Sequence, residues 1–392
     1  MKIKLVGIVL VLLLSGCYNY HELNELAITT AIGIDKKENG YKIISQVMNI
    51  KKKEANTNGG GNSPEVILYK TSNVSLKEGF REIVLKSPKR IYPSHLNVLL
   101  ISEEVARDGI KDILDVFFRD PIVRMQFNVL ITKGCTTEEV LETLTPGQTI
   151  SSKNILESQK SDTKYLGTSQ MITFEKLMDL YLDDNKSIVL PGVVVNNLTS
   201  DNEDIKNIEK SNNNTEIMLD STGIFSDDKL VSYIDNEESI YLNYIKGIIN
   251  SSLITCDCDL GKYFTASIEN VKSDVKFDKK DKKMVISIKA EAAVNELNCN
   301  INIEKESGML EIEKMINENL SNNIGDFVSK IQNVYNIDIF NFLDIIYKSD
   351  YSYYKEIKDN YYKDLFKDME VDVVCDIKVI KKGNVLRDTY DE

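Results

Sequence analysis

The first seventeen residues constrain this chain more than any other segment does. Lys2 and Lys4 precede an apolar run at residues 5–14 that only Gly7 interrupts. Crossing about 30 Å of hydrocarbon takes about 20 apolar residues, so this run is too short to be a transmembrane helix. A basic start followed by a short apolar run and small residues is typical of a secretory signal peptide. We therefore expect residues 1–16 to direct export and the residues after them to make the fold.

The residues at the end of the signal peptide predict how the exported chain is attached to the membrane. Leu14-Ser15-Gly16-Cys17 resembles the lipobox of bacterial lipoproteins, in which the leader is cut off just before a lipidated cysteine. We expect Cys17 to carry an S-diacylglycerol and an N-palmitoyl group, with residues 17–26 as a lipidated tether. Because each buried methylene contributes about 0.8 kcal/mol, two acyl chains anchor a protein where one is marginal. The alternative is an ordinary secretory signal with an incidental cysteine.

The length of the chain indicates how many domains it has, and its net charge excludes some classes of partner. At 392 residues it exceeds one typical core, so we expect two or three domains. The net charge is −13, and an acidic surface is repelled by phosphate backbones and by anionic lipid headgroups. We therefore expect no nucleic-acid partner. Contact with the membrane is expected to come from the lipid or from a partner protein.

Hydrophobic patterns in the first half predict an N-terminal α/β-type domain at residues 27–195. Ser102 follows a compact apolar strand and is a good helix cap. Thr136-x-x-Glu139 follows another strand and is a capping-box pattern. A strand, helix, strand, helix order favours a mixed sheet with helices packed on it. The strands that we expect in this half lie at residues 27–35, 41–50, 96–101 and 126–132.

A polar stretch at residues 196–214 is the clearest boundary in the chain. Beyond it we expect a C-terminal α+β domain at residues 215–392, with strands where apolar and polar residues alternate at 284–291 and 371–379. The fold class is therefore α+β, with several domains and with mixed and antiparallel sheets carrying packed helices on a lipid-anchored body. The other elements expected here are a hairpin at 215–225 and 229–234 and helices at 236–249, 310–334 and 351–366.

Short segments in a fixed order along the chain point to a known family. Cys17 is followed by Glu22-Leu23-Asn24, and Asp338-Ile339-Phe340-Asn341-Phe342 follows the expected long helix. With residues 32–35, 94–121 and 223–231, these segments resemble the Ger(x)C lipoproteins, the C subunits of bacterial spore germinant receptors. Tyr18 stands where that family often has tryptophan, and Asn341 stands where it commonly has glycine. Neither departure touches the lipid chemistry.

The resemblance implies a location and a set of partners. It implies a three-domain α+β lipoprotein on the outer face of the inner spore membrane or of the cell membrane. There it would support assembly and signalling with two integral-membrane subunits, an A-type subunit and a transporter-like B-type subunit. In that family, nutrients trigger the release of ions through the receptor and dormancy ends. No catalytic residue carries over from the family.

A tyrosine-rich stretch near the C-terminus is the best candidate for a partner surface. Tyrosine is favoured at interfaces, because its ring buries area while its hydroxyl stays hydrogen-bonded. We hypothesise that this stretch contacts the membrane subunits of the receptor. The candidate residues are Tyr351, Tyr353, Tyr354, Tyr361 and Tyr362.

The residues give little support to an enzyme or to a metal site. The chain has two histidines, His21 in the tether and His95 just before an expected strand, so a paired-histidine metal site has no obvious source. Histidine is also too scarce for a convincing catalytic triad. Cys256-x-Cys258 with Cys299 is the most metal-like cluster, yet a structural zinc site takes four ligands at tighter spacing. We expect no catalytic residue, no metal and no cofactor.

The cysteines beyond Cys17 are odd in number and scattered, so they do not predict a disulfide framework. We expect most of them to be buried thiols that pack as small hydrophobic side chains. They are Cys135, Cys256, Cys258, Cys299 and Cys375.

Two other functional classes compete with the receptor subunit. A solute-binding lipoprotein of a transporter would share the anchor and the size, but it would have two similar α/β lobes around a cleft. A cell-envelope hydrolase would show clustered catalytic residues, which the sequence lacks. Both rank below the receptor subunit.

Overall fold

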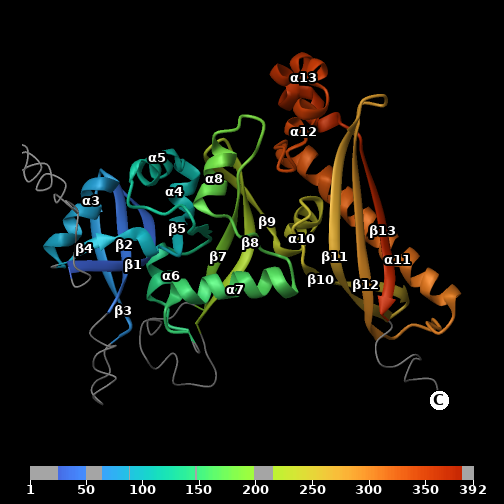
Figure 1. Cartoon of the computed structure of the whole chain (residues 1–392), viewed down its shortest axis with the longest axis horizontal. Helices are drawn as coiled ribbons and strands as arrows, with labels where there is room; N and C mark the ends of the chain where they lie inside the picture. The colour runs from blue at the N-terminus through green and yellow to red at the C-terminus, as the bar shows by residue number, and fades with distance from the viewer. Residues whose placement is uncertain (1–24, 50–63, 88, 146–147, 198–214, 382–392) are drawn as a thin grey trace, which may run out of the picture.

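The computed structural model describes residues 25–49, 64–87, 89–145, 148–197 and 215–381. The signal peptide, Cys17 and nearly all of the tether lie outside these residues, so the expectations about them stay predictions. The described chain forms an elongated body with one β-sheet in each half and helices packed against both (Figure 1). This architecture confirms the α+β class with mixed and antiparallel sheets.

The larger sheet has nine strands and is mixed. Its strands are β1 (Leu26–Lys37), β2 (Gly40–Met48), β3 (Val66–Asn73), β4 (Arg90–Tyr92), β5 (Val98–Ser102), β6 (Asn128–Thr132), β7 (Val189–Asn196), β8 (Glu216–Ser226) and β9 (Lys229–Asp235). Their order is β3-β2-β1-β5-β6-β7-β8-β9, and β4 pairs with the start of β1. The central strands β1, β5, β6 and β7 are parallel, and antiparallel strands flank them on both sides.

Alternation along the parallel strands gives this sheet two buried faces. On β5, Leu99 and Ile101 belong to one core, while Val98 and Leu100 belong to the other. Strands that are buried on both faces read as continuous apolar runs, which explains the compact pattern of this segment. Helices α3 (Leu76–Glu82), α4 (Glu103–Asp108), α5 (Lys111–Arg119) and α8 (Phe174–Tyr181) cover the first face, and α6 (Thr137–Glu142) and α7 (Ser151–Tyr165) cover the second.

The smaller sheet has four strands, β10 (Ser251–Asp259), β11 (Lys262–Asp278), β12 (Lys283–Leu297) and β13 (Val371–Lys381). They lie in this order, antiparallel except for the parallel pair β12 and β13. Met284, Ile286 and Ile288 are fully buried, which confirms the alternation expected on β12.

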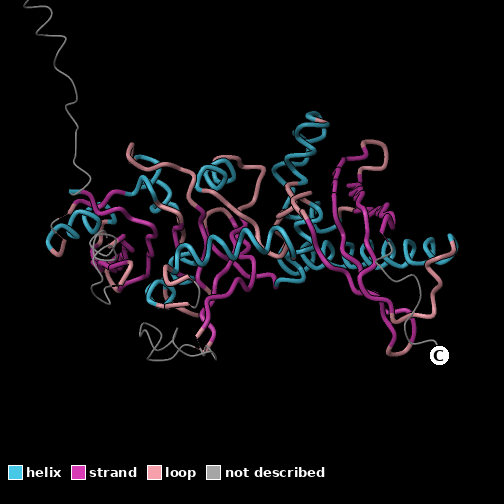
Figure 2. Tube along the Cα trace, turned by 60° about the horizontal axis from the view of Figure 1, so that its bottom comes forward, coloured by secondary structure: helices cyan, strands magenta, loops and turns pink. Residues whose placement is uncertain are grey.

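The long helix α11 (Glu306–Lys330) runs alongside the smaller sheet (Figures 1 and 2). It buries a stripe that includes Ile312, Ile316 and Leu320 in the same core as the strands. None of the helices in the described residues is both long enough and apolar enough to cross a membrane.

The strands on either side of the expected linker pair with each other. Most of residues 196–214 lie outside the described residues, and β7 and β8 run antiparallel from Val189 opposite Ile224 to Asn196 opposite Glu216. The larger sheet therefore continues through β9, and α10 (Asn236–Ile245) packs into the core of the smaller sheet. The two sheets differ in size and strand direction, so the described residues do not form the two similar lobes that a solute-binding lipoprotein requires.

The helix expected at residues 351–366 is interrupted. The structure has α12 (Phe342–Ser349), α13 (Tyr351–Ile357), a 3₁₀ turn (Lys358–Asn360), a π-helical turn (Tyr361–Leu365) and α14 (Phe366–Asp368). Tyr361 and Phe366 are fully buried at the two ends of this irregular stretch. Since 361 and 366 lie five residues apart, the wider π turn places both side chains on the core side.

Candidate partner surface

The candidate surface is carried by α12 and α13, which lie beside the upper end of the smaller sheet, with α13 at the top of Figure 1. The turn that starts α12 contains Asn341 with φ 64° and ψ 37°, in the left-handed region. Asparagine tolerates that region better than most residues, so it serves where glycine would. Asp338 fixes the turn, because its Oδ2 accepts the backbone N–H of Leu343 at 2.8 Å.

Three tyrosine rings gather where α12 meets α13. The ring centroid of Tyr347 lies 5.6 Å from that of Tyr351 and 5.0 Å from that of Tyr354. Tyr347 is 42% exposed and Tyr351 is 55% exposed, so two of the rings face solvent. We call Tyr347, Tyr351 and Tyr354 the tyrosine cluster. Tyr347 was missed by the sequence analysis, although its spacing of four and seven residues from the other two is the spacing of one helical face.

Contacts with both halves of the molecule hold the cluster in place. The hydroxyl of Tyr354 donates to Asn185 Oδ1 at 3.0 Å, which ties α13 to the loop that precedes β7. Tyr353 stacks on Phe277 at 5.3 Å, and the ammonium of Lys282 lies 4.7 Å from the centre of the Tyr353 ring. Both of these partners belong to the hairpin of β11 and β12, so Tyr353 fastens α13 and is itself only half-exposed.

Tyr361 is not a surface residue, and its inclusion in the partner surface was wrong. Its side chain is fully buried, and its hydroxyl donates to Asp338 Oδ2 at 2.9 Å. Burial raises the pKa of both groups, that of Asp338 above the ordinary carboxyl value and that of Tyr361 well above 10. Tyr361 therefore stays a hydrogen-bond donor. Tyr362 is partly exposed, and its ring centroid lies 5.0 Å from that of Tyr361.

This arrangement suits recognition of a partner. The exposed rings of the tyrosine cluster present apolar area and hydroxyl groups on a segment that is already ordered. Tyrosine gives large contact area at low conformational-entropy cost, because few torsions must be fixed on binding. A partner that docks here would not have to order the segment first.

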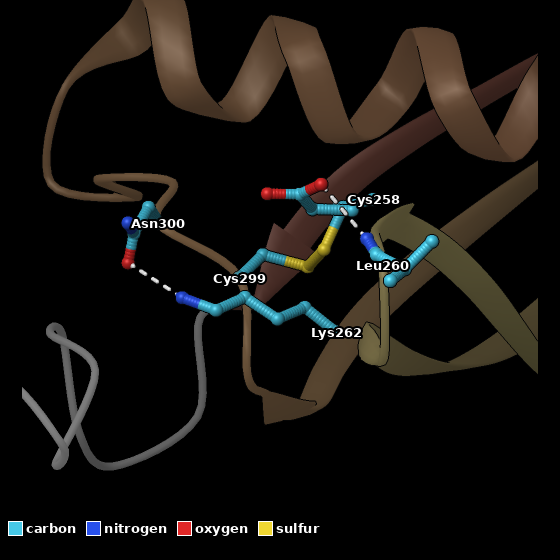
Figure 3. Close-up of a disulfide and its surroundings, with 6 residues drawn as sticks. Cys258, Leu260, Lys262, Cys299 and Asn300 are labelled. Carbon is cyan, nitrogen blue, oxygen red and sulfur yellow. Dashed lines mark hydrogen bonds between the residues drawn. A yellow bond between two sulfur atoms is a disulfide. The ribbon is translucent and has the colours of Figure 1, made fainter.

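Two of the five cysteines beyond Cys17 depart from the expectation of unpaired thiols, and Cys135, Cys256 and Cys375 are free. Cys258 and Cys299 form a disulfide with a Cα–Cα distance of 6.2 Å, which joins the end of β10 to the segment after β12 (Figure 3). Beside it, Lys262 Nζ donates to Asn300 Oδ1 at 3.3 Å. Cys256 faces the core as a free thiol, and burial raises its pKa to about 11. The pairing was missed because Cys299 reaches Cys258 only through the register of β10, β11 and β12.

The remaining candidate ligands lie apart. His95 ends a 3₁₀ turn, and its ring lies 6.4 Å from that of Tyr92. His21 lies outside the described residues. Within the described ranges, no three histidine, cysteine or acidic side chains are grouped so as to hold a metal ion.

Comparison with known proteins gives the same family over both halves. The model of the spore germination protein N-terminal domain matches residues 19–195, and the model described as spore germination B3/GerAC like, C-terminal, matches residues 220–383. Spore germination protein KC of Bacillus subtilis (strain 168) is 23% identical over 95% of this chain and 93% of its own length. Spore germination protein B3 of the same organism is 22% identical over 96% of each chain.

A solved structure shares the fold. The crystal structure of the GerBC protein matches with a TM-score of 0.53 and 19% sequence identity, covering 89% of this chain and 97% of that one. At this identity the likeness concerns the fold alone. It extends over both sheets, since nine-tenths of the chain takes part.

Proposed function

Because this chain belongs to the Ger(x)C family, the C subunits of spore germination receptors, we propose that it is a lipid-anchored, non-enzymatic subunit of a nutrient germinant receptor. In this proposal it sits on the outer face of the inner spore membrane and binds integral-membrane subunits, one A-type and one transporter-like B-type. The folded body then stabilises the receptor or couples its states.

In this proposal, the lipid anchor keeps the folded body close to its membrane partners. Lipid on Cys17 confines the body to the membrane surface and raises its effective concentration near membrane partners, without any new protein contact. We expect mass spectrometry of the mature N-terminus to show a lipidated Cys17, and Cys17→Ala to lose membrane retention and impair the nutrient response. An unmodified thiol at residue 17, or a normal response from a fully soluble Cys17→Ala protein, would contradict this step.

The observation that carries the partner proposal is the tyrosine cluster. Two exposed aromatic rings lie on a segment that both halves of the molecule hold in place. Exposed aromatic side chains on a preformed surface are typical of binding hot spots, where single truncations cost about 2 kcal/mol or more. A loss of that size weakens association roughly thirtyfold.

The test is co-purification from spore membranes. Tyr347→Ser with Tyr351→Ser should reduce the recovery of two polytopic membrane proteins with this chain, while the lipid still holds the chain in the membrane. Tyr165→Ser is the matched control, because Tyr165 is 59% exposed on α7 in the other half of the molecule. Equal recovery with the cluster variant and the control would remove the tyrosine cluster from the interface.

A further inference from the structure

A second feature lies in the N-terminal half of the molecule, where α3 and β4 meet α5 (Figure 1, left). A cavity of about 270 Å³ opens there. Its walls are mostly apolar and include Phe80, Val116 and Phe117. Its volume is near the lower end of the range for small-molecule sites, roughly 300–1,000 Å³, so it suits one slender apolar group.

The mouth of the cavity is basic in an acidic protein. Lys77, Arg81 and Arg90 line it, and among the described lining residues Asp120 is the one carboxylate. Residues 76–93 contain five basic and two acidic side chains, whereas the whole chain has a net charge of −13. This local excess gives an anion a place to bind on a body that otherwise repels it.

Asp120 does not cancel this charge. It pairs with Lys77, and its Oδ1 accepts the backbone N–H of Ile122 at 3.1 Å. Partial burial alone would raise the pKa of Asp120, but these donors lower it below the ordinary value. Asp120 therefore stays ionised and compensates Lys77, with a further attraction to Arg90. Arg81 is exposed and adds a guanidinium group to the lining.

The rim of the cavity exposes apolar side chains. Val84 lines the cavity and is 53% exposed. It lies in the 3₁₀ turn that follows α3 (Ile83–Leu85), whose last residue, Leu85, lies outside the cavity lining and is 87% exposed. Apolar side chains on a rim next to basic groups match the boundary between hydrocarbon and anionic headgroups.

The cavity also lies next to the point where the tether enters the fold. Leu26, the first residue of β1, pairs with Arg90 of β4, and Ala27 pairs with Ile91. Leu26 lies nine residues after Cys17, and nine extended residues span at most about 32 Å. If Cys17 is lipidated, as the proposed function holds, the bilayer is within reach of the cavity.

We propose that this cavity binds the acyl end of an anionic lipid from the adjacent membrane. The apolar walls take part of one acyl chain, and Arg81 binds the acidic headgroup. A planar guanidinium forms paired hydrogen bonds with phosphate oxygens, which makes arginine the better choice for this headgroup than a point charge. The lipid then gives the body a second point of attachment to the membrane, beside the proposed anchor at Cys17.

The binding test uses the full chain with Cys17→Ala, which has no lipid of its own. Dodecyl phosphate, titrated calorimetrically below its critical micelle concentration, should bind with one-to-one stoichiometry. Dodecyl maltoside, which has the same chain and no charge, should bind at least tenfold more weakly, and inorganic phosphate should give no saturable signal. Absence of saturable dodecyl phosphate binding would overturn the site.

Two variants separate the site from general charge effects. Arg81→Gln should weaken dodecyl phosphate binding at least fivefold, and Val116→Phe should abolish it by filling the cavity. Arg119→Gln is the control, since Arg119 lies on α5 outside the cavity lining and its side chain is 76% exposed. Thermal melts identify any variant that fails to fold. Equal binding by the Arg81 variant and the Arg119 control would overturn the role of the basic mouth.

Vesicles identify the source of the ligand. The Cys17→Ala chain should sediment with phosphatidylglycerol vesicles and not with phosphatidylcholine vesicles, and Arg81→Gln should reduce this sedimentation. Dodecyl phosphate binding without sedimentation would overturn the bilayer as the source. Failure of the anchor proposal would instead appear as an unmodified Cys17 in the wild-type chain, and it would leave these titrations unchanged.

Discussion

Breaking the disulfide between Cys258 and Cys299 should destabilise the C-terminal half by about 4 kcal/mol. The bond joins residues separated by 41 positions. For a loop of that length, the chain-entropy relation gives about 4 kcal/mol at 25 °C, because the crosslink restricts the unfolded chain. The loop contains β11 and β12, the two central strands of the smaller sheet. We therefore expect the loss of stability to affect the pairing of these two strands.

The measurement is thermal unfolding of the full chain carrying Cys17→Ala, with and without dithiothreitol. In a cooperative unit of 150–250 residues, about 4 kcal/mol lowers the midpoint by about 8–16 °C. Cys258→Ser with Cys299→Ser should give the same fall without reductant and no further fall with it. Cys375→Ser is the control, because Cys375 is a free, half-buried thiol outside the loop. A shift below about 2 °C, or an equal effect of reductant on the double variant, would refute the reasoning.

Urea unfolding of the same chain tests two further contacts. Tyr361→Phe keeps the buried ring but removes its hydrogen bond to Asp338. At a pH above the folded-state pKa of Asp338, this loss should lower the free energy of unfolding by about 1.5–3 kcal/mol. A loss smaller than about 0.5 kcal/mol would contradict the contact. Burial raises the pKa of Asp338, so the folded state holds the proton more tightly than the unfolded state. The contribution of Asp338 to stability should therefore be largest below about pH 3.9 and fall as pH rises through its folded-state pKa, so the difference in stability between wild type and Asp338→Asn should change over this range. Asn341→Gly keeps the left-handed backbone and loses only a long hydrogen bond from Ser187 N–H to Asn341 Oδ1, at 3.4 Å, so it should change the urea midpoint little. Asn341→Val should cost about 1–2 kcal/mol more than the glycine variant because φ is 64°; equal midpoints for the two variants would show that the turn is not constrained.

Local patterns allowed much of the fold to be predicted. The Ser102 side chain accepts the N–H of Val105, and Thr136 and Glu139 form the expected capping box. The hairpin of β8 and β9 and the alternation along β12 also lie within a few residues of where they were expected. Each of these features depends on residues that are neighbours in sequence, so the pattern and the contact coincide.

Features that depend on distant contacts were not predicted. In strand β10, Leu253 is exposed and Ser252 is buried. The order of apolar and polar residues along β10 therefore does not show which face of the strand is buried. Of the tyrosines expected on the partner surface, Tyr351 is exposed and Tyr361 is buried. The burial of Tyr361 involves a contact with Asp338, 23 positions earlier, which the local sequence does not reveal. The disulfide likewise needs three strands in register before its cysteines meet.

The pairing of β7 with β8 has a consequence for folding during translation and for the choice of truncated fragments. A ribosome must pass residue 235 before the larger sheet has all its strands, so a nascent chain that ends at 195 presents an unpaired edge along β7. Bare edges of this kind recruit strands from other molecules. A fragment cut at the polar stretch should therefore aggregate, whereas one that ends between β9 and α10 keeps every strand of that sheet together.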